Sequence, residues 1–313
     1  MTLSHPTHLP SASFGRAFAI GVSLNLGFVL VEAFYGWKTG SLALLADAGH
    51  NLSDVAGLLL AWAAFGAARL KPNRRHTYGW RRASILASFI NATILLVAMG
   101  SLLWEALHRF QTPTTVDALT VIWVAGVGVI INSITAGLFL TGSEKDLNIR
   151  GAFLHMAADA LVSLGVVMAG LLYLWQGWLW IDPVASILIA LIIIAGTWSL
   201  FRRSLHLLFD GVPEHIDLDQ VEASLLTLPG VVAVHDLHVW AMSTRENALT
   251  AHLVCEQSNA DKALGTLLCQ AADRINRHFS IQHITLQCES PTFSEHCVVA
   301  PVSRVSVSKQ EGV

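Results

Sequence analysis

The chain has 313 residues, of which 53% are hydrophobic and 13% are charged, with a mean hydropathy of +0.55. Soluble domains carry about 25% charged residues, so this composition excludes an ordinary soluble protein and indicates a membrane protein. The net charge of -3 and pI near 6.5 exclude the basic surface that nucleic-acid binding requires. None of the four cysteines forms a CxxC pair, which excludes a thiolate zinc ribbon.

Six apolar segments are long enough to cross a bilayer as helices: 17–37, 42–68, 83–107, 118–141, 152–175 and 181–201. The loop between the second and third segments is basic, whereas the loops on the other side offer only Lys38 and Arg109. Basic loops stay in the cytosol, so both termini are expected to be cytoplasmic. Asp182 and Pro183 indicate the start of the last helix.

The pattern changes after Pro213. Periodicity predicts helices at 217–228 and 261–279 and strands at 231–241, 248–256 and 283–289. The fold class is therefore an all-α six-helix transmembrane domain plus a small cytoplasmic α/β domain of αββαβ order. We expect a short cytoplasmic N-terminus at 1–14, the transmembrane domain at 15–205, the α/β domain at 206–290 and a disordered tail at 291–313.

The second segment, LLADAGHNLSDVAGLLL, carries costly polar residues. A carboxylate at the centre of a membrane helix costs about 2.5–3.5 kcal/mol on insertion scales, so its presence indicates a function. Asp47, His50 and Asp54 are spaced by three and four residues and share one helix face. His50 and Asp54 can therefore reach one ligand.

The fifth segment repeats this spacing, because His155 and Asp159 are four residues apart in GAFLHMAADALVSLGV. Two imidazoles and two carboxylates supply the four ligands that zinc prefers. A single HxxxD pair is explained equally well by a hydrogen-bonded histidine in the helix interior or by a metal site. The occurrence of two such pairs favours the metal site. Asp47 has two open interpretations: it tunes His50 from behind the site without binding the metal, or it faces water near the mouth. The remaining polar residues of the spans are expected to form interhelical hydrogen bonds; they are Glu32, Asn25, Asn91 and Asn132.

The paired HxxxD motifs, the segment HTYGWRRASILA and the segment GVVAVHDLHVWA together resemble the cation diffusion facilitator family over residues 14–290. The resemblance is closest to bacterial zinc exporters. It implies a homodimeric zinc/proton antiporter of the bacterial inner membrane with a metallochaperone-like cytoplasmic domain. It also implies that the transport site consists of His50, Asp54, His155 and Asp159.

The same resemblance implies a cytoplasmic metal site at His235, His252 and Glu289, with zinc as a regulatory ion as well as the substrate. Further candidate ligands lie close by in the sequence; they are His238, His283 and Cys288. Strand alternation predicts that His238 faces away from His235. The alternative is that these residues are ordinary polar side chains of a half-exposed sheet.

Three further positions follow from the resemblance. His76 matches one position of a metal site in the basic loop, but Trp80 occupies another, which disfavours that site. Arg82 and Asp210 match a salt bridge that ties the helices to the dimer junction. The loop GSEKDLNIRG between the fourth and fifth segments contains no histidine, which excludes metal capture there.

We therefore expect zinc efflux by exchange for protons, since metal ligands must lose protons before they bind metal. The expected partners are Zn²⁺, H⁺, the lipid bilayer and a second copy of the chain, without nucleic acid. One alternative is an exporter of a broader set that includes cadmium, cobalt and nickel. Another is an intramembrane zinc enzyme, which the absence of HExxH disfavours. A third is a metal sensor, for which no output module is visible.

Overall fold

The computed structural model describes residues 12–140, 147–256, 261–291 and 306–307. The chain forms two compact units. The first contains the residues up to Leu60 together with Ile90–Phe201, and the second contains Ala61–Phe89 together with the residues from Arg202 onward. Of the expected N-terminal segment 1–14, only the residues from Ala12 onward are described, and they begin the first helix.

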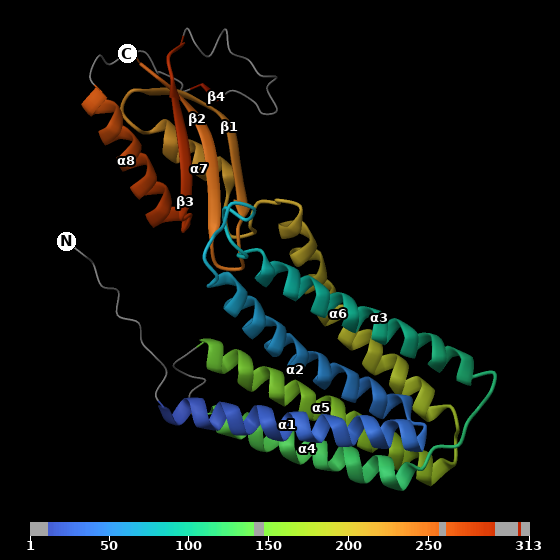
Figure 1. Cartoon of the computed structure of the whole chain (residues 1–313). Helices are drawn as coiled ribbons and strands as arrows, with labels where there is room; N and C mark the ends of the chain where they lie inside the picture. The colour runs from blue at the N-terminus through green and yellow to red at the C-terminus, as the bar shows by residue number, and fades with distance from the viewer. Residues whose placement is uncertain (1–11, 141–146, 257–260, 292–305, 308–313) are drawn as a thin grey trace. The chain divides into compact units, whose positions relative to one another are not determined.

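Six long helices precede the C-terminal domain (Figure 1). They are α1 (Ala12–Thr39), α2 (Leu42–Ala68), α3 (Ala83–Arg109), α4 (Ala118–Leu140), α5 (Leu147–Gln176) and α6 (Ile181–Leu208). Within the described residues, α2 to α6 are each long and apolar enough to span a membrane. The predicted six-helix membrane fold is confirmed. One boundary differs, because α6 continues through Arg202 and Arg203 to Leu208.

Each helix contributes apolar side chains to the interior of the first unit. The buried cluster includes Phe28, Leu44, Met99, Val124, Val166 and Ile193, one from each of α1 to α6. Glycine lets α4 and α5 approach closely, because a Cβ on Gly170 would lie 2.7 Å from Cγ1 of Ile122. This packing fixes the position of α5, one of the two helices that carry the predicted ligands.

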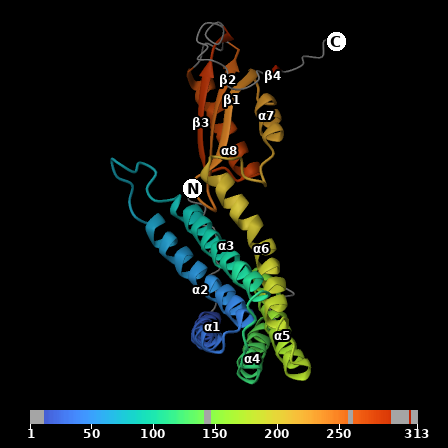
Figure 2. The ribbon, with the colours of Figure 1, turned by 90° about the vertical axis from the view of Figure 1, so that its right-hand side faces the viewer.

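The C-terminal domain is a sheet covered by two helices on one face (Figure 2). Its elements are α7 (Leu218–Leu226), β1 (Val231–Ala241), β2 (Asn247–Cys255), α8 (Asp261–Phe279), β3 (His283–Glu289) and β4 (Ser306–Val307). The strand order is β3-β2-β1-β4, with β2 parallel to β3 and antiparallel to β1. Val221 of α7 and Ile275 of α8 pack against Leu249 and Leu253 of β2 in its core. The predicted αββαβ order is confirmed.

Strand β4 was not expected. It lies in the segment 291–313, for which the sequence predicts a disordered tail, and it pairs antiparallel with β1 through Val307 and Ser306. For these two residues the prediction was wrong. The rest of the segment beyond Pro291 lies outside the described residues.

A β-bulge in β1 overturns the prediction that His238 faces away from His235. The register pairs His235 with His252 but His238 with Thr250, so β1 advances three residues while β2 advances two. Asp236, at the bulge, has a φ of 52°. The extra residue reverses the alternation beyond it. His238 therefore lies on the same face of the sheet as His235 and His252.

Candidate metal centres

The two HxxxD pairs of α2 and α5 face each other. Nε2 of His50 lies 3.4 Å from Oδ1 of Asp159, and Nε2 of His155 lies 3.1 Å from Oδ2 of Asp54. Within each helix, Nε2 of His50 is 3.8 Å from Oδ2 of Asp54, and Nε2 of His155 is 3.7 Å from Oδ2 of Asp159. The structure thus brings all four predicted ligands together.

These separations suit one small cation. With zinc–ligand bonds of about 2.0–2.1 Å, the corners of a ligand tetrahedron lie about 3.3–3.4 Å apart. The four nitrogen–oxygen separations range from 3.1 to 3.8 Å, which is close to these edge lengths. His50, Asp54 and Asp159 each offer an atom within 4.8 Å of the other two. His155 joins them through its contacts with both carboxylates.

Burial differs across the site. The side chains of Asp159 and His50 are 2% and 19% exposed, whereas those of Asp54 and His155 are 30% and 43% exposed. The site therefore has a closed side and an open edge. Oδ2 of Asp159 is buried and finds no hydrogen-bond partner among the residues that the structure describes, which is expensive for a carboxylate unless it binds a cation.

Two contacts hold α2 in register for these ligands. Asp182 of α6 caps its first turn, because its Oδ1 accepts a hydrogen bond from Ser41 Oγ at 2.6 Å and its Oδ2 one from the amide of Leu42 at 3.0 Å. Nη1 of Arg109, at the end of α3, is 3.6 Å from the same carboxylate. The sequence indicated Asp182 only as a helix start, because its partners are distant along the chain.

Of the two interpretations of Asp47 left open by the sequence, the structure contradicts the one in which Asp47 faces water. Its side chain is fully buried, so it does not face water, and its bonds go to residues other than His50. Ser163 Oγ of α5 donates to Asp47 Oδ2 at 2.7 Å, which links the two helices that carry the ligands. The sequence offered no signal for Ser163, because a serine on an apolar helix reads as a small packing residue.

The expected interhelical hydrogen bonds form in part. Asn51 Nδ2 is 3.4 Å from Oε2 of Glu32, which joins α2 to α1, and Ser53 Oγ is 3.5 Å from Oδ1 of Asn91, which joins α2 to α3. Asn132 differs, because neither of its buried amide atoms has a hydrogen-bond partner within the described residues. The side chain of Asn25 lies outside the described residues.

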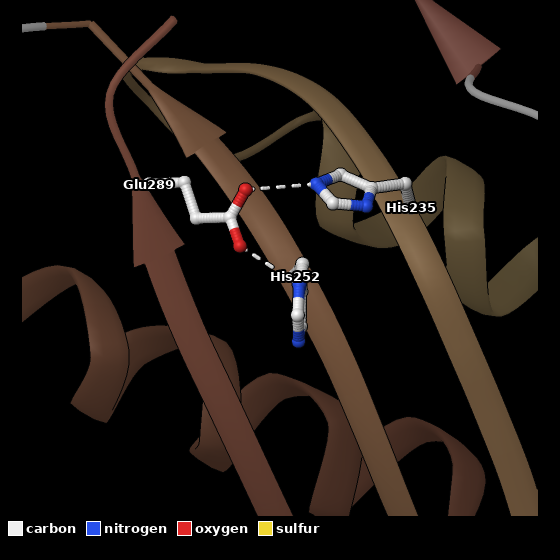
Figure 3. Close-up of side chains that lie close together, drawn as sticks. All are labelled: His235, His252 and Glu289. Carbon is white, nitrogen blue, oxygen red and sulfur yellow. Dashed lines mark hydrogen bonds and ion pairs between the residues drawn. The ribbon is translucent and has the colours of Figure 1, made fainter. Parts of the chain in front are cut away.

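A second group of ligands lies on the open face of the C-terminal sheet (Figure 3). Oε2 of Glu289 is 3.0 Å from Nε2 of His235, and its Oε1 is 2.8 Å from Nδ1 of His252. The register explains the gathering, because His235 pairs directly with His252, and Glu289 pairs with Val254, two residues along β2. Two imidazoles and a buried carboxylate can hold a divalent metal.

The other C-terminal candidates do not join this group. His238 contacts Asp236 at 2.9 Å, and His283 contacts Nη1 of Arg81 at 2.6 Å. Cys288 lies on the helix-covered side of the sheet, packed against the core with Cys255. Burial, and then the neighbouring Cys288 thiol, raise the pKa of Cys255 to about 12, so it stays protonated near neutral pH.

The basic loop carries no group of three metal ligands within the described residues. His76 instead stacks on Trp80, with ring centroids 4.3 Å apart. The predicted contact between Arg82 and Asp210 is present as an exposed ion pair. Residues 141–146 of the loop between α4 and α5 lie outside the described part of the chain.

Two family models match successive parts of the chain. The model of the cation efflux transmembrane domain matches residues 18–209, and that of the cation efflux protein cytoplasmic domain matches residues 213–291. The chain belongs to the cation efflux (cation diffusion facilitator) family. The predicted family is thereby confirmed.

Relatives in the cation efflux family match over most of their length. The zinc transporter ZitB of Escherichia coli is 37% identical over 90% of this chain and 90% of that protein. The cadmium, cobalt and zinc/H(+)-K(+) antiporter of Bacillus subtilis is 35% identical over 88% of this chain and 89% of that protein. The metal cation efflux system protein CzcD of Cupriavidus metallidurans is 34% identical over 91% of this chain and 92% of that protein. This chain is therefore a multi-pass membrane protein of a metal-efflux family whose members are transporters.

Proposed function

We propose that the chain exports zinc by zinc/proton antiport through a tetrahedral site made by His50, Asp54, His155 and Asp159. The observation that carries the proposal is the convergence of two HxxxD pairs, with nitrogen–oxygen separations of 3.1 and 3.4 Å between α2 and α5. Two nitrogen and two oxygen ligands favour zinc over harder cations such as magnesium and calcium, which prefer oxygen alone. A ZitB-like substrate agrees with this ligand set.

Exchange for protons follows from the chemistry of the ligands. Imidazole nitrogens and carboxylates bind zinc only after losing their protons, so a proton gradient can load the site with protons on one side and with zinc on the other. The name of the Bacillus subtilis relative includes proton exchange, which supports the same coupling here. Exchange of zinc for protons at these ligands requires no enzymatic reaction.

We also propose an inner-membrane homodimer with both termini in the cytosol. The orientation is supported by the basic loop between α2 and α3, which includes Arg74, Arg75 and Arg81, and by the positive-inside rule. Dimerisation is supported by the match of residues 213–291 to the family's dimer domain. The group at His235, His252 and Glu289 supports a regulatory zinc site in that domain.

The test is metal flux in sealed proteoliposomes with an imposed pH gradient. We expect zinc to accumulate on the acidic side and protons to move the opposite way, with a smaller flux of cadmium, cobalt or nickel. Equal fluxes of all four metals would favour the broader exporter. Zinc binding without flux would favour a sensor or an intramembrane enzyme and would refute export.

A further inference from the structure

A cluster of buried polar groups lies beside the four ligands and takes no part in binding the metal. Glu32 of α1, Asp47 and Asn51 of α2 and Ser163 of α5 are each no more than 1% exposed. The side-chain amide of Asn51 sits between the two acidic groups, with Nδ2 3.3 Å from Asp47 Oδ1 and 3.4 Å from Glu32 Oε2. Ser163 completes the cluster by donating to the other oxygen of Asp47.

This cluster has too few donors for two carboxylates. Among the described residues neither Glu32 nor Asp47 forms an ion pair with a lysine, arginine or histidine. Oε1 of Glu32 is buried and has no hydrogen-bond partner in the described part of the chain, and one amide group serves both acids. Burying two unpaired carboxylates side by side in a membrane protein is prohibitively costly, and a proton shared between them removes one of the charges.

The charged groups that act on this pair come from the metal site. His50 of α2 and Asp159 of α5 interact electrostatically with Asp47, and Asp159 does so with Glu32. Asp47 precedes His50 by three residues, a spacing that places their Cβ atoms about 5–6 Å apart on one helix face. A divalent cation held by His50 and Asp159 would therefore favour the ionised form of the pair, whereas an empty site would favour the protonated form.

We propose that Glu32 and Asp47 hold one proton between them when the metal site is empty and release it when zinc binds, so that the pair is a proton-carrying site separate from the four ligands. In this step the O–H bond of the carboxylic acid breaks, its electron pair stays on the carboxylate and the proton passes to water. The inference rests on the proposed function, because it assigns part of the proton exchange to residues that do not touch the metal.

The test measures protons released per zinc bound by the purified full-length protein in weakly buffered solution with a pH indicator. Glu32→Gln should lower this count by about one relative to wild type, because the amide carries no exchangeable carboxyl proton. Glu105→Gln is the matched control, since Glu105 is an exposed acid of α3 that pairs with Arg109. It should release as many protons as wild type. An unchanged count in Glu32→Gln would overturn the proposal.

Two further measurements separate this inference from the proposed function. Exchange of labelled for unlabelled zinc across proteoliposomes needs no net proton movement, so Glu32→Gln should retain it while accumulating less zinc than wild type under the same pH gradient. Absence of exchange in wild type would refute zinc transport itself. In case the variant does not fold, infrared difference spectra of wild type should show the carbonyl band of a protonated carboxylic acid disappearing when zinc is added. Persistence or absence of that band would contradict the shared proton.

Discussion

Replacing Asp159 with Asn should weaken zinc binding at the transmembrane site by about 10²- to 10⁴-fold. The side chain is only 2% exposed, and its two oxygens lie 3.4 Å from Nε2 of His50 and 3.7 Å from Nε2 of His155. The substitution preserves shape but removes the negative charge that offsets the bound cation. Breaking one partner of a buried charge pair costs about 3–5 kcal/mol, which corresponds to that loss of affinity.

Calorimetric titration with zinc measures this loss. The parent protein should carry His235→Ala and His252→Ala, so that only the transmembrane site contributes heat. Asp117→Asn is the matched control, because Asp117 is an exposed acid that caps α4 through Thr120 and asparagine caps helices equally well. Its affinity should equal that of the parent. A dissociation constant for Asp159→Asn within a factor of about three of the parent would refute the assignment, because a threefold change corresponds to a loss of binding free energy below about 1 kcal/mol.

Three other predictions concern selectivity, regulation and titration. His50→Asp should raise the uptake of cadmium relative to zinc, because it replaces a nitrogen ligand by oxygen and loosens the tetrahedral site; an unchanged ratio in vesicle uptake would count against this. His235→Ala with His252→Ala should raise the zinc concentration for half-maximal flux yet spare metal preference, and a changed preference would show that the domain selects the metal. Cys255, with its pKa raised to about 12, should react with iodoacetamide at pH 8 far more slowly than the exposed Cys269, as mass spectrometry can measure. Because burial raises the pKa of the Cys255 thiol, this group stabilises the fold fully below its ordinary pKa of 9.0 and less as the pH rises toward 12, so a melting temperature that rose over that range would contradict the shift.

The sequence predicted the elements whose signal is local. The spans were recognisable because bilayer thickness sets the length of an apolar run, and the limits of β1 and β3 coincide with the observed ones. His50, Asp54, His155 and Asp159 could be chosen because the same costly pair at helical spacing occurs twice. Whether the two pairs face each other is not a local property, and the structure supplies that answer.

The features that the sequence did not predict depend on contacts distant along the chain. The bulge at Asp236 has a positive φ that strand alternation does not reveal, so the sequence predicted the wrong face of the sheet for His238. The bond from Ser163 to Asp47 joins residues 116 positions apart. The hydropathy pattern did not predict that α6 extends past Phe201, because the arginines that follow end the apolar run although the helix continues through them.

The most direct test of the central claim is zinc K-edge X-ray absorption on the His235→Ala, His252→Ala protein loaded with one zinc per chain. We expect four nitrogen and oxygen ligands at about 2.0–2.1 Å with outer-shell scattering from two imidazoles. Conversion of Asp54 and Asp159 to Asn should abolish loading. A sulfur shell at about 2.3 Å, a single imidazole, or undiminished loading of the double Asn variant would contradict a site made by these four residues.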